Sequence, residues 1–206
     1  MLYNARTFGE FSSRYLQTLT GLAGSLDTAR PENAGHHERV SRVGRALAAA
    51  LELAPEEVEA IAIAGRIHDV GMVGVVGLEG AFAADIQHPA VGARLVEHLP
   101  LHRSVANAVA CHHEWFDGWG FPSGLVGRAI PRAGRVLAVA EFVVEMTTPD
   151  AARSAWSAKR LADELKQRRG IQFDPEIADL TVQLIEAHAP ELVAARVVTG
   201  PTAEEA

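Results

Sequence analysis

Apolar residues recur at intervals of three and four along most of the chain, the pattern of helices with one buried face. The segments expected to be helical are 1–30, 36–51, 55–69, 89–99, 105–112 and 132–146, with two more around 161–165 and 177–184. The first of them places Phe8, Phe11, Tyr15, Leu19, Leu22 and Leu26 on one face. No alternation long enough for a β-strand stands out. The pattern therefore predicts an all-α fold.

Turn-forming residues separate these segments. Residues 71–80 are rich in glycine and valine, and residues 116–131 carry four glycines and two prolines, so both are expected to be loops. Pro89 is expected to open the fourth helix, with His88 at its edge. We predict a single helical bundle with an N-terminal helix over 1–30, a core domain over 31–190 and a C-terminal tail over 191–206.

Composition narrows the classes of function. A chain of 206 residues can bury a sizeable core. Its net charge of −7 argues against binding of bulk nucleic acid. The single cysteine, Cys111, excludes an internal disulfide and fits a reducing compartment. Since neither a membrane-length apolar run nor a signal peptide is recognisable, we expect a cytoplasmic protein without a membrane partner.

The pair His68-Asp69 continues the apolar face of the third predicted helix. An imidazole beside a carboxylate offers one nitrogen ligand and one oxygen ligand that can bridge two cations. Alone, the pair could equally be a core histidine with an aspartate that caps the next turn.

Other candidate ligands also lie at helix ends or on apolar faces: His36, His88, His112, His113 and Glu141. Five histidines that converge with two carboxylates are hard to satisfy without cations, so we predict a metal site inside the bundle. Imidazole and carboxylate suit iron, manganese or zinc. His37 should point away from the face of His36. The histidines expected at the surface or in ordinary packing are His98, His102 and His188.

Four sequence blocks and a downstream stretch carry a family resemblance over most of residues 15–180. The blocks are Ala34-Gly35-His36-His37-Glu38-Arg39-Val40, His68-Asp69-Val70-Gly71, His88-Pro89-Ala90-Val91-Gly92 and the long run from His112 to Pro122, followed by Gly170-Ile171-Gln172-Phe173-Asp174-Pro175. Together they resemble the HD-GYP branch of the HD phosphohydrolase superfamily. The long block is the specific one, because His-Asp alone is a weak signal.

The resemblance implies a helical fold that holds two or three iron or manganese ions and hydrolyses cyclic di-GMP. It maps His36, His68, Asp69, His88, His112, His113 and Glu141 onto ligand positions, with Asp69 as the bridging and catalytic carboxylate. Glu32 precedes His36 by one helical turn, where members with three metals carry a glutamate.

Several positions depart from the family pattern. Met72 replaces a lysine that meets substrate phosphate, Phe121 replaces the signature tyrosine, and Glu141 replaces an aspartate. The segment between Asp69 and His88 is also shorter than usual. Trp115 and Phe121 could stack on a guanine base or could simply close the core.

The residues allow metal-assisted phosphoester hydrolysis, in which two cations share and activate a water. Three classes of function remain open: a cyclic dinucleotide phosphodiesterase, a catalytically degenerate domain that binds a nucleotide or a partner, and another enzyme of the superfamily. The third class includes nucleotide phosphohydrolases and di-iron oxygenases. The expected ligand is a cyclic dinucleotide or another small phosphoester, and a signalling-protein partner or a homodimer is left open.

Overall fold

The computed structural model describes residues 2–29, 34–75, 81–149 and 154–187, and within them every regular element is a helix. The elements are α1 (Leu2–Ala29), α2 (His36–Ala50), α3 (Pro55–Ile67), η2 (Val70–Val75, 3₁₀), α4 (Ala81–Val96), α5 (Ser104–Cys111), η3 (Gly127–Ala129, 3₁₀), α6 (Arg132–Thr147), α7 (Ala158–Arg168) and α8 (Pro175–Glu186). The all-α prediction is confirmed.

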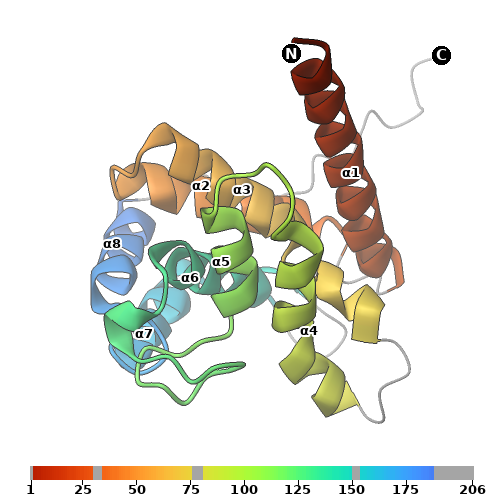
Figure 1. The fold of residues 1–206 in the computed structure, drawn as a ribbon. Coiled ribbons are helices and arrows are strands. Elements are labelled where there is room, and N and C mark those ends of the chain that lie inside the picture. Colours follow the sequence, from red (N-terminus) through yellow and green to blue (C-terminus); the bar gives the residue numbers. More distant parts are fainter. Residues whose placement is uncertain (1, 30–33, 76–80, 150–153, 188–206) are drawn as a thin grey trace, which may run out of the picture.

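The core lies where α2, α3, α5 and α6 pack together. Val40, Ile61, Val109 and Leu137, one from each of these helices, are fully buried. Helix α4 packs on α5 and η2, α7 pairs with α8, and α1 lies at the edge of the bundle (Figure 1). No helix among the described residues is both long and apolar enough to span a bilayer.

Helices α3 and α8 both begin at a proline and carry acidic residues in their first turn. Helix α3 begins at Pro55 with Glu56 and Glu57 in its first turn, as predicted. Helix α8 begins after Asp174, whose carboxylate accepts a hydrogen bond from the backbone N–H of Glu176 at 2.8 Å.

Two predicted boundaries are wrong. Helix α4 starts at Ala81, so Pro89 and His88 lie inside it and not at its start. Proline removes one helical hydrogen bond, but packing of α4 on η2 and α5 holds the helix through it. The expected loop 71–80 begins instead as η2, in which the Met72 N–H donates to the Asp69 carbonyl at 2.8 Å.

The buried stripe of α1 also differs from the predicted one. Leu22, expected on the buried face, is 39 % exposed. Leu19 is buried as predicted, but the stripe continues through Ala23 and Asp27, so it follows a four-residue spacing that includes a carboxylate.

Some predictions fall on residues outside the described ranges. Glu32 and His188 are among them, and so is the tail over 191–206. The proposed roles of these residues, and the domain boundaries at 31 and 190, stay predictions.

Candidate metal centre

The candidate ligands come from separate elements and meet inside the bundle. His36 opens α2, His68 and Asp69 follow α3, His88 lies in α4, His112 and His113 follow α5, and Glu141 lies in α6. His68 and His112 occupy equivalent positions in their elements. Each is the first residue after the end of its helix, α3 or α5, and its ring is buried in the core. The structure therefore brings together every predicted ligand that it describes.

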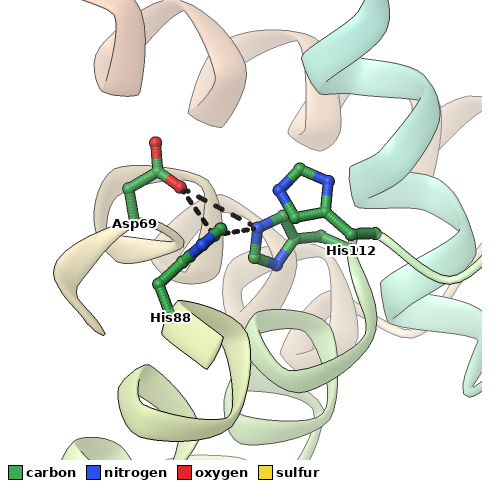
Figure 2. Close-up of side chains that lie close together, drawn as sticks. Asp69, His88 and His112 are labelled. Atoms are coloured by element: carbon green, nitrogen blue, oxygen red, sulfur yellow. Dashed lines mark hydrogen bonds and ion pairs between the residues drawn. The ribbon is translucent and has the colours of Figure 1, made fainter. Parts of the chain in front are cut away.

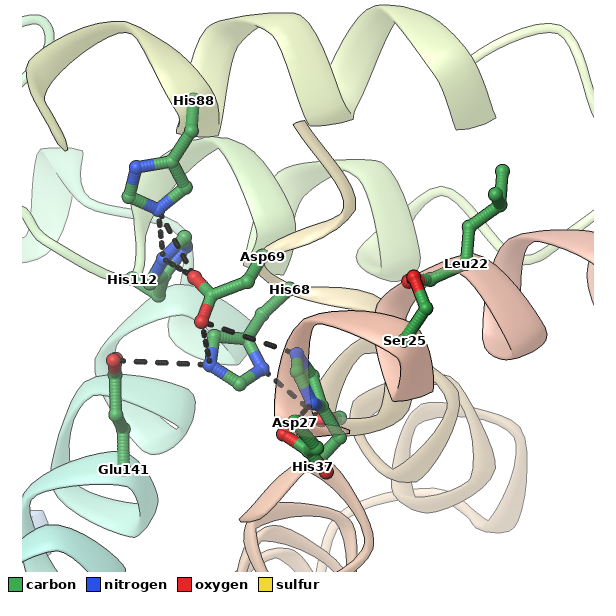
Figure 3. A network of polar contacts seen from close by, with 10 residues as sticks. Leu22, Ser25, Asp27, His37, His68, Asp69, His88, His112 and Glu141 are labelled. Atoms are coloured by element: carbon green, nitrogen blue, oxygen red, sulfur yellow. Dashed lines mark hydrogen bonds and ion pairs between the residues drawn. The ribbon is translucent and has the colours of Figure 1, made fainter. Parts of the chain in front are cut away.

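Asp69 lies between two groups of imidazoles (Figures 2 and 3). Its Oδ1 is 3.2 Å from His88 Nε2 and 3.9 Å from His112 Nε2. Its Oδ2 is 3.3 Å from His68 Nε2. Two sets of ligand atoms each gather within 4.8 Å, one with His88, His112 and His113 and one with His36 and His68, and Asp69 belongs to both. This is the arrangement expected of a carboxylate that bridges two cations.

Backbone carbonyls fix which nitrogen of two rings faces the cluster. His68 Nδ1–H donates to the Gly65 carbonyl at 3.0 Å, and His112 Nδ1–H donates to the Val109 carbonyl at 2.8 Å. A carbonyl can only accept, so each outer nitrogen keeps its hydrogen and each Nε2 faces Asp69. Such outer hydrogen bonds are typical of metal-bound histidines.

Burial lowers the pKa of several candidate histidine ligands and so favours their neutral form. It lowers the pKa of His36 to about 3 and that of His113 to about 4. Burial and the neighbouring histidines likewise hold the pKa of His112 below its usual value. These rings therefore offer free electron pairs at neutral pH.

Two other groups of the cluster have raised pKa values. Burial alone would lower the pKa of His68, but the Asp69 and Glu141 carboxylates outweigh it and raise that pKa to about 10. Burial raises the pKa of Glu141, although His68 Nε2 lies 3.7 Å from its Oε1. The proton on His68 occupies the place that a cation would take.

The donor set fits a divalent cation. His68 Nε2, which faces Asp69 Oδ2 at 3.3 Å, is buried and has no hydrogen-bond partner within the described residues. The Nε2 atoms of His88 and His112 face each other at 3.2 Å, so a bare pair would repel unless one bound a proton or both bound a cation. Burial raises the pKa of the Cys111 thiol to about 11, so a thiolate is not part of the set.

Metal binding is expected to release protons. His68 is protonated below its pKa of about 10, whereas a ligand must be deprotonated, so affinity should rise as pH rises towards that value. One displaced proton weakens binding about tenfold for each unit that pH falls. His36, already neutral, adds nothing in this range. Chelator competition between about pH 6.5 and 8.5 measures the slope. A pH-independent affinity would contradict these protonation states.

Gly71 allows η2 to lie directly on α4 beside the cluster. A Cβ at this position would overlap the carbonyl of His88 and the backbone N of Gly92. We expect Gly71→Ala to lower the free energy of unfolding by about 2 kcal/mol. It should also weaken metal binding, because η2 directly follows Asp69 and α4 carries His88, whose Nε2 lies 3.2 Å from Asp69 Oδ1.

Gly21→Ala in α1 is the matched control, since a Cβ there meets nothing within 4 Å and alanine favours the helix. Denaturant unfolding and metal titration of both variants check this prediction. Equal stability of Gly71→Ala and the parent chain would show that the contact relaxes.

The predicted substrate-binding residues surround the cluster. Phe121 packs on a candidate ligand, with its ring centroid 4.8 Å from that of His113. Trp115 lines a cavity together with His112, His113 and Glu141. Met72 is half-buried in η2. The contact of Phe121 with His113 shows that this ring supports the site, whichever substrate binds.

Two features of the site were missed or misjudged from the sequence. Glu114 is buried and accepts hydrogen bonds from the backbone N–H groups of Ser123 at 2.7 Å and Leu125 at 3.0 Å, which holds the glycine-rich loop in place. His37 does not point away, because its Nε2 lies 3.9 Å from Asp69 Oδ2. The first turn of α2 is buried on two sides, since α1 places Asp27 against the ring of His37.

The model of the HD domain family matches residues 23–177. The cyclic di-GMP phosphodiesterase response regulator RpfG of Xanthomonas campestris is 30 % identical over 84 % of this chain and 49 % of its own. A 3′3′-cGAMP-specific phosphodiesterase 2 of Vibrio cholerae is 30 % identical over 85 % of this chain and 35 % of its own.

A solved structure shares the fold. The cyclic GMP-AMP-specific phosphodiesterase V-cGAP3 of V. cholerae superposes with a TM-score of 0.66 and 19 % identity, over 87 % of this chain and 51 % of that one. The chain thus spans about half, or less, of the length of these proteins. Since the family model matches more than half of the chain and the relatives are of the HD-GYP type, the chain belongs to the HD domain family, in its HD-GYP branch.

Proposed function

We propose that this chain is a metal-dependent phosphodiesterase that hydrolyses a cyclic dinucleotide. The observation that carries the proposal is the position of Asp69, whose two oxygens face two separate groups of imidazoles. The relatives named as cyclic di-GMP and 3′3′-cGAMP phosphodiesterases support the substrate class.

Each candidate ligand has a distinct task in this proposal. Asp69 bridges the two sides, the first side is completed by His88, His112 and His113, and the second by His36, His68 and Glu141. Glu32 remains the candidate for a third ion. Iron or manganese suits the imidazole and carboxylate donors, in two or three positions. Divalent cations held there would lower the pKa of a shared water and neutralise charge on the phosphoryl oxygens.

The protein groups orient the substrate and limit access of water. Asp69 is 26 % exposed, while His68 is fully buried, so of these two residues Asp69 is the one that a phosphodiester can reach. Trp115 lines a cavity together with His112 and His113, and Phe121 packs on the ring of His113. In this proposal the two aromatic rings contact a base of the substrate while its phosphate is bound at Asp69.

The complete set of described ligands favours an enzyme over a degenerate binding domain. A degenerate domain would be expected to have lost ligands, whereas here every described ligand position keeps an imidazole or a carboxylate, with Glu141 in place of an aspartate. A di-iron oxygenase would use the same donors but would consume oxygen and leave a phosphodiester intact.

The test is product analysis at fixed metal content. Iron- and manganese-loaded protein is incubated with cyclic di-GMP, 3′3′-cGAMP and a non-cyclic phosphodiester, and products are separated by chromatography. We expect linear dinucleotide from the cyclic substrates and little turnover of the non-cyclic one. Equal turnover of all three would assign a general phosphodiesterase, and oxygen uptake without phosphodiester cleavage would overturn the proposal.

A further inference from the structure

His37 and Asp27 form a buried pair outside the ligand set that the family resemblance implies. His37 Nδ1 lies 2.7 Å from Asp27 Oδ1, and both residues are more than nine-tenths buried (Figure 3). Asp27 belongs to α1, which contributes no ligand in the proposed function. Burial of a carboxylate at the bundle's edge is costly unless it serves a partner.

The other nitrogen of His37 faces the metal centre. His37 Nε2 is buried, has no hydrogen-bond partner within the described part of the chain, and lies 3.9 Å from Asp69 Oδ2. That oxygen is the one that faces His68. The rings of His37 and His68 lie 4.9 Å apart, centroid to centroid. Figure 3 shows both rings directed towards Asp69, that of His37 from α2 and that of His68 from the turn after α3.

The arrangement repeats that of His68 and His112. In all three residues an acceptor holds Nδ1, and Nε2 is directed at an Asp69 oxygen. His37 differs only in that its acceptor is a carboxylate, not a backbone carbonyl. A carboxylate on the outer nitrogen fixes the tautomer and makes the imidazole a stronger ligand. A buried ring nitrogen in this position, with no hydrogen-bond partner among the described residues, is suited to bind a cation.

We propose that His37, oriented by Asp27, is an additional metal ligand on the side of the centre formed by His36 and His68. The inference rests on the metal site of the proposed function and adds a ligand to it. It also makes α1 part of the metal centre, because Asp27 is the residue that sets the ring of His37. Loading with metal should then strengthen the attachment of α1 to the bundle.

The competing explanation is a clasp, in which the pair only ties α1 to α2. His37→Asn separates the two roles. An asparagine amide N–H can still donate to Asp27, but its short side chain does not extend to the position of Nε2. Asp27→Asn tests the outer contact and preserves the shape of the side chain. His98→Asn is the matched control, because His98 is at the surface with its side chain 88 % exposed.

Metal content is measured by elemental analysis after reconstitution with manganese or iron, and affinity by chelator competition. We expect His37→Asn to lose one ion per chain, or to bind it at least ~10-fold more weakly, and Asp27→Asn to weaken the same ion ~10–100-fold. The absorption spectrum of the cobalt-loaded protein should change in both variants. His98→Asn should match the parent chain in all three readouts.

If His37→Asn and Asp27→Asn retain the parent's metal count, affinity and cobalt spectrum, the pair is a clasp and the proposal is wrong. Thermal unfolding of the metal-free variants separates this outcome from misfolding, and the conservative Asp27→Asn gives a second reading if His37→Asn is unstable. None of these readouts needs a substrate. An inactive parent chain would therefore overturn the proposed function and leave this inference standing.

Discussion

Asp69→Ala is expected to abolish metal binding and hydrolysis together. Both oxygens of Asp69 face imidazole nitrogens, Oδ1 towards His88 and Oδ2 towards His68. Without this carboxylate, the two groups of histidines would share no anionic ligand, and the positive charge of the cations would not be neutralised between them. We expect less than about one ion per chain and a rate reduced by about 10³-fold or more.

Asp163→Ala is the control for this prediction. Asp163 is a half-exposed carboxylate of α7 that pairs with Lys159 at 2.8 Å, away from the centre. Its variant should bind metal and turn over substrate like the parent chain. Full metal occupancy in Asp69→Ala would show that the histidines and Glu141 hold the ions alone, and the role of Asp69 as bridge would be wrong.

Met72→Lys is expected to raise the rate on a cyclic dinucleotide by at least ~10-fold and by as much as ~10³-fold. Met72 lies one 3₁₀ turn after Asp69, and its N–H donates to the Asp69 carbonyl at 2.8 Å. A lysine here would place an ammonium near the phosphate, in the position that the family resemblance assigns to a lysine. Methionine supplies bulk without charge, so the parent chain should turn over cyclic di-GMP slowly.

The matched variant is Met72→Leu, which keeps an apolar side chain of similar size. Rates are compared at equal metal content, because Met72 is outside the proposed ligand set and metal binding should not change. If the parent is already fast and Met72→Lys changes nothing, other groups bind the phosphate. The departures at Met72 and Phe121 would then have no bearing on activity.

Helical periodicity was sufficient to predict most of the fold. The apolar repeat predicted α3 and α6 closely, because each has buried apolar residues at helical spacing and a clear start at Pro55 or after Pro131. It failed at α4, where a proline inside the helix looks like a start. Only the packing of α4 on η2 and α5 reveals why the helix continues through Pro89.

The candidate metal ligands could be predicted from the sequence where a residue's immediate neighbours in the chain made it stand out. His68, His112 and Glu141 stand on apolar faces, where a polar residue is conspicuous. His37 was misjudged because helical geometry separates it from His36, and the sequence does not show that α1 covers its other side. The available signal was Asp27, a carboxylate four residues after Ala23 on a buried stripe.

Hydrolysis in ¹⁸O-labelled water tests the central claim most directly. The metal-loaded chain is incubated with cyclic di-GMP or 3′3′-cGAMP, and the products are analysed by mass spectrometry with and without chelator. If water activated at the Asp69 centre attacks phosphorus, linear dinucleotide should form with one ¹⁸O in its terminal phosphate, and chelator should prevent it. Intact cyclic dinucleotide after incubation with fully loaded protein, or cleavage that chelator leaves unchanged, would contradict the account.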